Sequence, residues 1–123
     1  MNTKDILNSN NFVFKKKFGQ NFLLDQNILN NIVKEADITK DTLVIEIGVG
    51  AAALTKKLSL KAKTVLGYEI DETLKEPLNV ILNDLSNVDI IFDDFLNRCV
   101  KDDLKKYEYK TLMVVANLPY YIT

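Results

Sequence analysis

Apolar residues recur at two different spacings along this chain, and the spacing switches repeatedly between residues 25 and 116. Four short runs of apolar, mostly branched residues predict buried strands, at residues 43–47, 64–68, 88–92 and 112–116. Between them lie segments whose apolar residues are three or four positions apart, which predict helices at 51–60, 73–83 and 97–106. Pro77 indicates that the second of these helices is kinked or begins late.

A further helix is predicted ahead of the first strand. Asp25 can cap its N-terminus, because a carboxylate accepts hydrogen bonds from the first free backbone N–H groups of a helix. The apolar residues that follow share one helical face, which we expect to be buried: Ile28, Leu29, Ile32, Val33 and Ala36. Strands that alternate with helices in this way are typical of βαβ units, so the expected fold class is α/β with a parallel sheet.

Polar residues and glycines follow each predicted strand. In an open parallel sheet ligands bind at the edge formed by the carboxyl ends of the strands. Because βαβ crossovers are right-handed, all four predicted strands end at the same edge. The residues brought there are Glu46 and Gly48, then Glu69, Asp94 and Asn117. This convergence predicts a ligand site.

The stretch EIGVGAAALT at residues 46–55 is the first part of that site. Gly48 and Gly50 allow a tight turn close to a ligand, and the helix that follows offers free N–H groups to an anion. The spacing Gly48-x-Gly50-x-x-Ala53 fits a dinucleotide site, a methyl-donor site or a plain strand-to-helix turn. Glu69 can accept hydrogen bonds from the vicinal hydroxyls of a ribose, which both kinds of cofactor contain. These alternatives stay open on this stretch.

Two more carboxylates lie near the predicted edge, and they are assigned different roles. Asp94 is suited to accept a hydrogen bond from an adenine amino group. Asp93 is predicted to be simply exposed, and Asp71 to cap a helix.

Composition and charge narrow the class of protein. The 123 residues, 47% apolar and 27% charged, suit one modest soluble domain. No apolar run approaches the roughly 20 residues that span a bilayer, and the N-terminus lacks a signal-peptide core, so we expect no membrane and a cytoplasmic location. With no histidine and the single cysteine Cys99, neither a disulfide nor a metal site is expected. Lys15, Lys16 and Lys17, among phenylalanines, form either a solvated surface or a nucleic-acid contact.

Four stretches together resemble the rRNA adenine dimethyltransferase family. They are FGQNFL at residues 18–23, EIGVG at 46–50, YEID at 68–71 and NLPY at 117–120, in the family's order. The likeness runs from about Lys15 to the last residue, and NLPYYIT favours the small-subunit rRNA enzymes over the related erythromycin-resistance methylases. One departure is Ala52, where many methyltransferases carry a third glycine; its small side chain should leave cofactor binding intact.

The resemblance implies a Rossmann-like fold that binds S-adenosylmethionine and N6-dimethylates two adjacent adenines near the 3′ end of small-subunit rRNA, within an assembling ribosomal subunit. Residues 1–24 would cover the cofactor and target, and residues 25–123 would be an incomplete catalytic domain. Lys15, Lys16 and Lys17 would contact RNA phosphates. The cofactor would contact Asn21, Leu23, Gly48, Gly50, Glu69, Asp94 and Asn117.

The acceptor half of the implied site is Asn117, Leu118, Pro119 and Tyr120. S-adenosylmethionine carries an activated methyl group, so the enzyme mainly has to position the acceptor amine. The Asn117 side-chain oxygen and the Leu118 carbonyl can accept hydrogen bonds from the N6 amine and stabilise positive charge on it. Pro119 fixes the backbone, and Tyr120 offers an aromatic face to the base.

Members of the family carry more strands and a helical RNA-binding C-terminal domain, so only the first four strands of the sheet are expected here. The fourth strand is apolar on both faces over residues 113–116, and as an exposed edge it would favour self-association. We therefore expect a truncated chain with little methyl transfer of its own. The alternatives are an inactive fragment that binds cofactor or RNA, and an NAD-dependent oxidoreductase domain, which would not account for residues 18–23 or 117–120.

Overall fold

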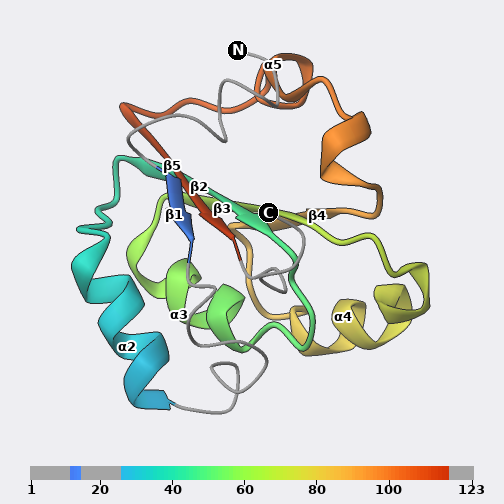
Figure 1. Cartoon of the computed structure of the whole chain (residues 1–123), viewed down its shortest axis with the longest axis horizontal. Helices are drawn as coiled ribbons and strands as arrows, with labels where there is room; N and C mark the ends of the chain where they lie inside the picture. The colour runs from blue at the N-terminus through green and yellow to red at the C-terminus, as the bar shows by residue number, and fades with distance from the viewer. Residues whose placement is uncertain (1–11, 15–25, 117–123) are drawn as a thin grey trace.

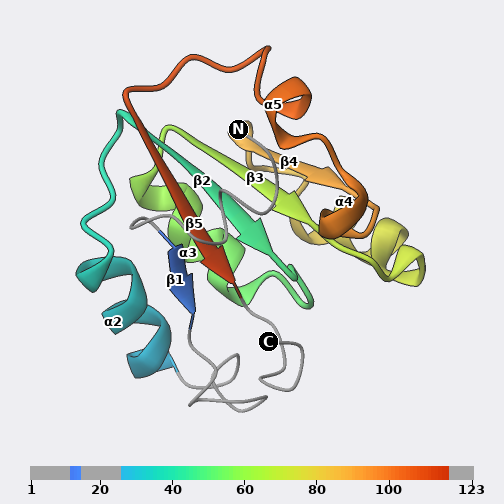
Figure 2. The same cartoon turned by 45° about the horizontal axis from the view of Figure 1, so that its top comes forward.

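Five parallel strands form one sheet at the centre of the computed structural model, which describes residues 12–14 and 26–116 (Figure 1). The strand order is β1-β5-β2-β3-β4. The bounds are Phe12–Phe14 for β1, Thr42–Ile47 for β2, Thr64–Tyr68 for β3, Val88–Ile91 for β4 and Thr111–Ala116 for β5. Because every neighbouring pair is parallel, the carboxyl ends gather at one edge, as the arrowheads in Figure 2 show.

The central strand β2 explains why the sheet has two apolar faces. All six of its residues are buried, and their side chains alternate between the faces. Val44 packs on one face, while Leu43 and Ile45 pack on the other. A strand buried on both sides is typical of a parallel sheet covered by helices. Because β2 pairs along its length with β3 and β5, it sets where these neighbouring strands end.

Helices cover the two faces unequally. Figure 1 shows α2, α3 and α4 on one side of the sheet and α5 on the other. On the first side, Val33, Leu54 and Leu58 pack against β2 and β3. On the second, Phe95 and Val100 pack against Leu43 and Ile45. The bounds are Gln26–Glu35 for α2, Ala53–Lys61 for α3, Lys75–Ile81 for α4 and Val100–Asp103 for α5, with 3-10 turns η2 at Glu72–Leu74 and η3 at Phe95–Asn97.

The predicted elements are confirmed in order and type, with changes at their ends. The strand predicted at residues 64–68 has those bounds, and the other three differ by one residue. The helix predicted at 73–83 begins as η2 and becomes α-helical only at Lys75, which agrees with the late start that Pro77 suggested. The helix predicted at 97–106 is reduced to η3 and α5. Of the predicted face of α2, Val33 and Ala36 are buried; Asp25 and the other side chains lie outside the described part.

One strand was not predicted, and it corrects the expectation of an exposed edge. β1 pairs in parallel with β5, from Phe12 opposite Val114 to Phe14 opposite Ala116. The apolar half of β5 therefore lies between β1 and β2 rather than at the edge of the sheet. This pairing satisfies backbone groups that an apolar edge would leave free, and it removes the reason given for self-association through that strand.

Two other predictions concern the chain as a whole. The boundary at residue 24, between a covering segment and the catalytic domain, falls in a stretch outside the described residues. Among the helices that the structure describes, none is long and apolar enough to cross a membrane.

Candidate functional site

Three residues of the loop after β2 have positive φ angles, a backbone conformation that favours glycine. The φ angles of Gly48, Gly50 and Ala52 are 85°, 56° and 70°, all in the left-handed region. The Gly48 N–H donates to the Tyr68 carbonyl at 2.8 Å, which fastens the start of the loop to β3. Ala52 is fully buried, and holding alanine in this conformation costs about 1 kcal/mol. These angles delay the start of α3 to Ala53, two residues later than the pattern predicted.

Glu69 holds the same loop from the end of β3. Its side chain is nearly buried, with 7% of its surface exposed. One carboxylate oxygen accepts a hydrogen bond from the Gly50 N–H at 2.8 Å, and the other accepts from the Asp71 N–H at 2.9 Å. A carboxylate has about four acceptor positions, so about two remain for hydroxyl groups of a ligand. Glu69, the predicted ribose acceptor, therefore also anchors the glycine loop through its hydrogen bond with Gly50.

Asp93 and Asp94 form a turn where β4 ends. The Asp94 carboxylate caps η3 by accepting from the Leu96 N–H at 3.0 Å. Asp93 accepts from the Asp94 N–H at 2.7 Å and also pairs with Arg98. The prediction that Asp93 is simply exposed is therefore incomplete, since its carboxylate organises the turn. Asp71 caps η2 as predicted, accepting from the Thr73 N–H at 3.0 Å.

Gly67 is a part of the site that the sequence analysis missed. A Cβ atom placed on Gly67 would lie 2.6 Å from the Val49 side chain and 2.7 Å from the Ile90 side chain. Real Cβ atoms essentially never come so close, so the glycine makes room for the loop to cross β3. The available signal was a glycine inside an otherwise branched strand, which often marks a close approach of backbone.

Glu46 is a second feature whose surroundings the sequence did not reveal. Its side chain is fully buried in β2, directly before the glycine loop. The Thr55 hydroxyl of α3 donates to one carboxyl oxygen, and the other oxygen has no hydrogen-bond partner among the described residues. Burial raises the pKa of Glu46 to about 8; the Thr55 hydrogen bond opposes this shift and the nearby Glu69 adds to it. Glu46 therefore joins the strand before the loop to the helix after it.

Two exposed apolar residues flank the carboxylates. Ile70 follows Glu69 and is 67% exposed, and Leu96 lies two positions after Asp94 and is 62% exposed. Large apolar side chains beside buried or hydrogen-bonded carboxylates suit a ligand with a flat ring and polar edges. For Ile70 the available signal in the sequence was an apolar residue directly after the predicted ribose acceptor.

The remaining predicted site residues lie outside the described part of the chain. They are Lys15, Lys16, Lys17, Asn21 and Leu23, and the acceptor group Asn117, Leu118, Pro119 and Tyr120. The described chain reaches the ligand edge immediately before each of these two stretches, because β1 ends at Phe14 and β5 at Ala116, and these two residues are paired. No group of metal-binding side chains was found among residues 12–14 and 26–116.

Comparison with protein families decides what this arrangement belongs to. The model of the ribosomal RNA adenine dimethylase family matches residues 11–123. The chain belongs to this family. The glycine loop, Glu69 and the Asp93–Asp94 turn are thus parts of a methyltransferase fold, which confirms the Rossmann-like α/β fold expected from the sequence.

Relatives of the family are similar over nearly the whole chain. A protein of Oceanobacillus iheyensis named ribosomal RNA small subunit methyltransferase A is 48% identical over 98% of this chain. A protein of the same name from Staphylococcus aureus is 46% identical over the same share. The chain spans 42% and 41% of the length of these two relatives.

Solved structures give the same fold. A dimethyladenosine transferase from Plasmodium falciparum matches with a TM-score of 0.58 and 28% identity, over 80% of this chain and 34% of that one. The 23S rRNA methyltransferase ErmE matches with a TM-score of 0.57 and 32% identity, over 60% of this chain and 30% of that one.

Proposed function

We propose that this chain forms the cofactor-binding part of an S-adenosylmethionine-dependent rRNA adenine N6-dimethyltransferase. The substrate would be two adjacent adenines near the 3′ end of small-subunit rRNA, in an assembling subunit in the cytoplasm. The family and the names of the relatives support the class of reaction. The observation that carries the proposal is Glu69, whose nearly buried carboxylate faces the glycine loop and keeps acceptor capacity for a ribose.

The residues present fit this cofactor. Gly48 and Gly50 expose backbone without side chains, which suits close contact with the methionine part of the ligand. Glu69 would accept from the ribose hydroxyls and Asp94 from the adenine amino group. When bound, S-adenosylmethionine supplies a methyl group already activated for transfer. The residues of the chain then have to bind the cofactor, orient the acceptor amine towards its methyl group and exclude water from the site.

The acceptor adenine would be held by residues that follow β5. The Asn117 side-chain oxygen and the Leu118 carbonyl would accept hydrogen bonds from the N6 amine. These bonds would localise the nitrogen lone pair needed for attack and stabilise the positive charge that develops on the nitrogen. Pro119 would restrict the backbone, and Tyr120 would stack on the base. Asn21 and Leu23 would cover the cofactor. None of these roles needs histidine, and the chain has none.

The cofactor assignment is tested by binding. Isothermal titration calorimetry with S-adenosylmethionine should show one site, and NADH should not compete. Glu69→Gln should weaken binding about tenfold or more, because hydrogen bonds to a charged acceptor contribute about 1.5–3 kcal/mol. Glu72→Gln, which removes an exposed carboxylate three residues away, is the matched control and should bind normally. A preference for NADH would replace the proposal with an oxidoreductase domain.

The RNA assignment needs its own measurement. Replacing Lys15, Lys16 and Lys17 with alanine should weaken binding to a small-subunit rRNA fragment and make the salt dependence shallower, by about 2 in the logarithmic slope. Methyl transfer to that fragment distinguishes an active chain from one that only binds. A chain that binds the cofactor but transfers no methyl group would support the alternative of an inactive fragment.

A further inference from the structure

A chain of hydrogen bonds links the strand ends that carry the two predicted cofactor carboxylates. Arg98, in the turn after η3, donates to both oxygens of Asp103, from Nη2 at 2.7 Å and from Nε at 3.1 Å. Its Nη1 donates to Asp93 at 3.2 Å. The Tyr68 hydroxyl donates to Asp103 at 2.8 Å. We name these four residues, Tyr68, Asp93, Arg98 and Asp103, the Arg98 network.

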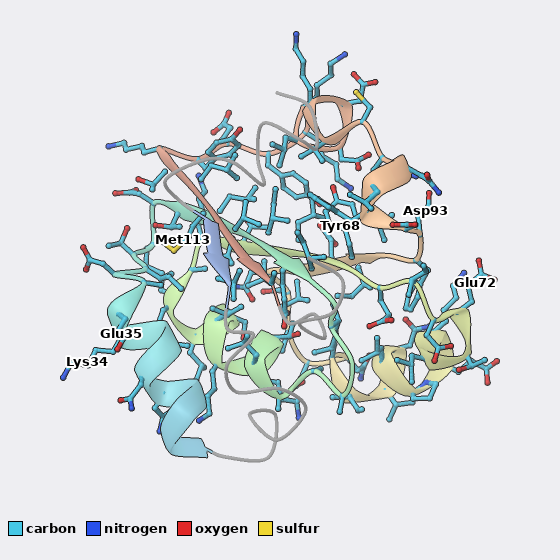
Figure 3. All side chains as sticks on the ribbon, in the orientation of Figure 1. Lys34, Glu35, Tyr68, Glu72, Asp93 and Met113 are labelled. Atoms are coloured by element: carbon cyan, nitrogen blue, oxygen red, sulfur yellow. The ribbon has the colours of Figure 1, made fainter. Side chains whose placement is uncertain are left out.

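The two ends of the Arg98 network adjoin the site. Tyr68 is the residue before Glu69, and Asp93 is the residue before Asp94 and binds its N–H. Figure 3 shows Tyr68 and Asp93 on the side of the sheet where η3 and α5 lie. The network therefore adds a side-chain link between the neighbours of the ribose acceptor and of the adenine acceptor, beside the backbone pairing of β3 with β4.

The inner end of the Arg98 network, formed by Tyr68 and Asp103, is held in place by burial. Tyr68 is 1% exposed, and its ring meets Phe95 edge to face, with 4.9 Å between ring centroids. The side chain of Asp103 is only 10% exposed. Burial alone would raise the pKa of Asp103, but the hydrogen bonds from Arg98 and Tyr68 outweigh burial and lower it. Asp103 is therefore a carboxylate that keeps its charge because both donors stay in place.

The outer end of the Arg98 network, at Asp93, adds a side-chain link to a turn that also has backbone bonds, such as the one from the Asn97 N–H to the Asp94 carbonyl at 2.9 Å. The Asp93 side chain is 40% exposed, and its carboxylate is shared between the Asp94 N–H and Arg98. A planar guanidinium donates along fixed directions, so Arg98 holds Asp93 and Asp103 in one relative position. If Arg98 were removed, Asp93 would lose the side-chain partner that joins it to Asp103, and the turn would be held only by its own backbone bonds and the buried Phe95.

We propose that Arg98 is a positioning residue for the nucleoside end of the cofactor. Through Asp103 and Asp93 it sets the separation of the Glu69 and Asp94 carboxylates, and so it favours ligands in which an adenine and a ribose are joined as in adenosine. This inference rests on the proposed function, because it takes Glu69 and Asp94 as the residues that contact the cofactor. Arg98 itself touches no reacting atom.

The test compares graded changes in the Arg98 network. Arg98→Ala removes all of the Arg98 side-chain bonds, Arg98→Lys keeps the charge but not the paired bonds to Asp103, and Tyr68→Phe removes one hydroxyl. Lys105→Ala is the matched control, because Lys105 makes an exposed ion pair with Asp102 at 3.0 Å in the same segment. Calorimetry would use S-adenosylmethionine and adenosine as ligands, at a temperature where every variant is folded.

We expect Arg98→Ala to weaken the binding of both ligands by the same factor, about tenfold, because the disturbed contacts are to the adenosine part that the two ligands share. Arg98→Lys and Tyr68→Phe should lose less, and Lys105→Ala nothing. A purely structural role would lower the melting temperature and leave affinity unchanged in folded protein. Normal affinity in Arg98→Ala, or a loss for S-adenosylmethionine but not for adenosine, would overturn the inference.

A second measurement does not depend on ligand binding. Amide hydrogen exchange of Asp94 and Leu96 in the ligand-free protein should be faster in Arg98→Ala than in the wild type, and unchanged in Lys105→Ala. If the wild-type chain bound neither ligand, the proposed function would fail for this chain. Unchanged exchange at Asp94 and Leu96 would refute the positioning role whether or not the cofactor binds.

Discussion

The buried carboxyl of Glu46 makes the stability of this fold depend on pH in a direction opposite to that of most carboxylates. We predict that Glu46→Gln removes this dependence. The variant keeps the size of the side chain and an oxygen that can accept from Thr55, but it cannot ionise. The glycine loop on one side and α3 on the other are otherwise unchanged.

The magnitude follows from the pKa of Glu46, which rises from 4.5 to about 8 on folding because burial disfavours the charged form. An acid with a higher pKa in the folded state binds its proton more tightly there. Its neutral form therefore contributes fully below pH 4.5, and the free energy of unfolding falls as the pH rises from 4.5 to about 8. Each pH unit in that window is worth about 1.4 kcal/mol, which gives at most about 5 kcal/mol in total.

The assay is urea denaturation followed by circular dichroism at several pH values from 5 to 8. Near pH 5 the wild type and Glu46→Gln should have similar stability, because both present a neutral group with one unpartnered position. Toward pH 8 the variant should become the more stable protein. Glu108→Gln removes an exposed carboxylate on the loop before β5 and should follow the wild-type curve. Parallel curves for the wild type and Glu46→Gln would show that our account of this buried group is wrong.

Two further substitutions test the packing around the loop. Gly67→Ala should lower the free energy of unfolding by about 1–3 kcal/mol, because its Cβ would collide with Val49 and Ile90; thermal denaturation measures this, and an unchanged melting temperature would contradict the close approach. Thr55→Val should cost about 1–3 kcal/mol by removing the hydrogen bond to Glu46. Because that bond lowers the pKa of Glu46, its loss should also extend the fall in stability above about pH 8, which the urea series would detect once it is continued to higher pH.

The fold was largely predictable because its strongest signals are local. Residues 64–68 form an apolar run between polar neighbours, and the strand has those bounds. β1 was missed because three residues, Phe12–Phe14, give too short a run, and only the partner β5 makes them a strand. The ends of α3 and α5 depend on backbone angles and tertiary bonds, such as φ at Ala52, that spacing does not encode.

The site was predictable in its chemistry but not in its connections. Glu69 and the glycine pair could be chosen because several predicted strands bring polar residues and glycines to the same edge of the sheet. Their mutual hydrogen bond, between residues nineteen positions apart, needs the sheet register to be known. The sequence carries no signal for Arg98, since an arginine is usually exposed. Only the structure shows that its donors reach Asp93 and Asp103.

Because Gly67 has no side chain, the glycine loop cannot be transferred to another scaffold by itself. The loop from Gly48 to Ala52 has the shape it has partly because the neighbouring strand offers an empty position for Val49. A graft of the loop alone, onto a sheet with any side chain at that place, would be pushed away from the strand that bears the ribose acceptor. The transferable unit is therefore the loop together with β3, two stretches of chain that no contiguous sequence motif would select.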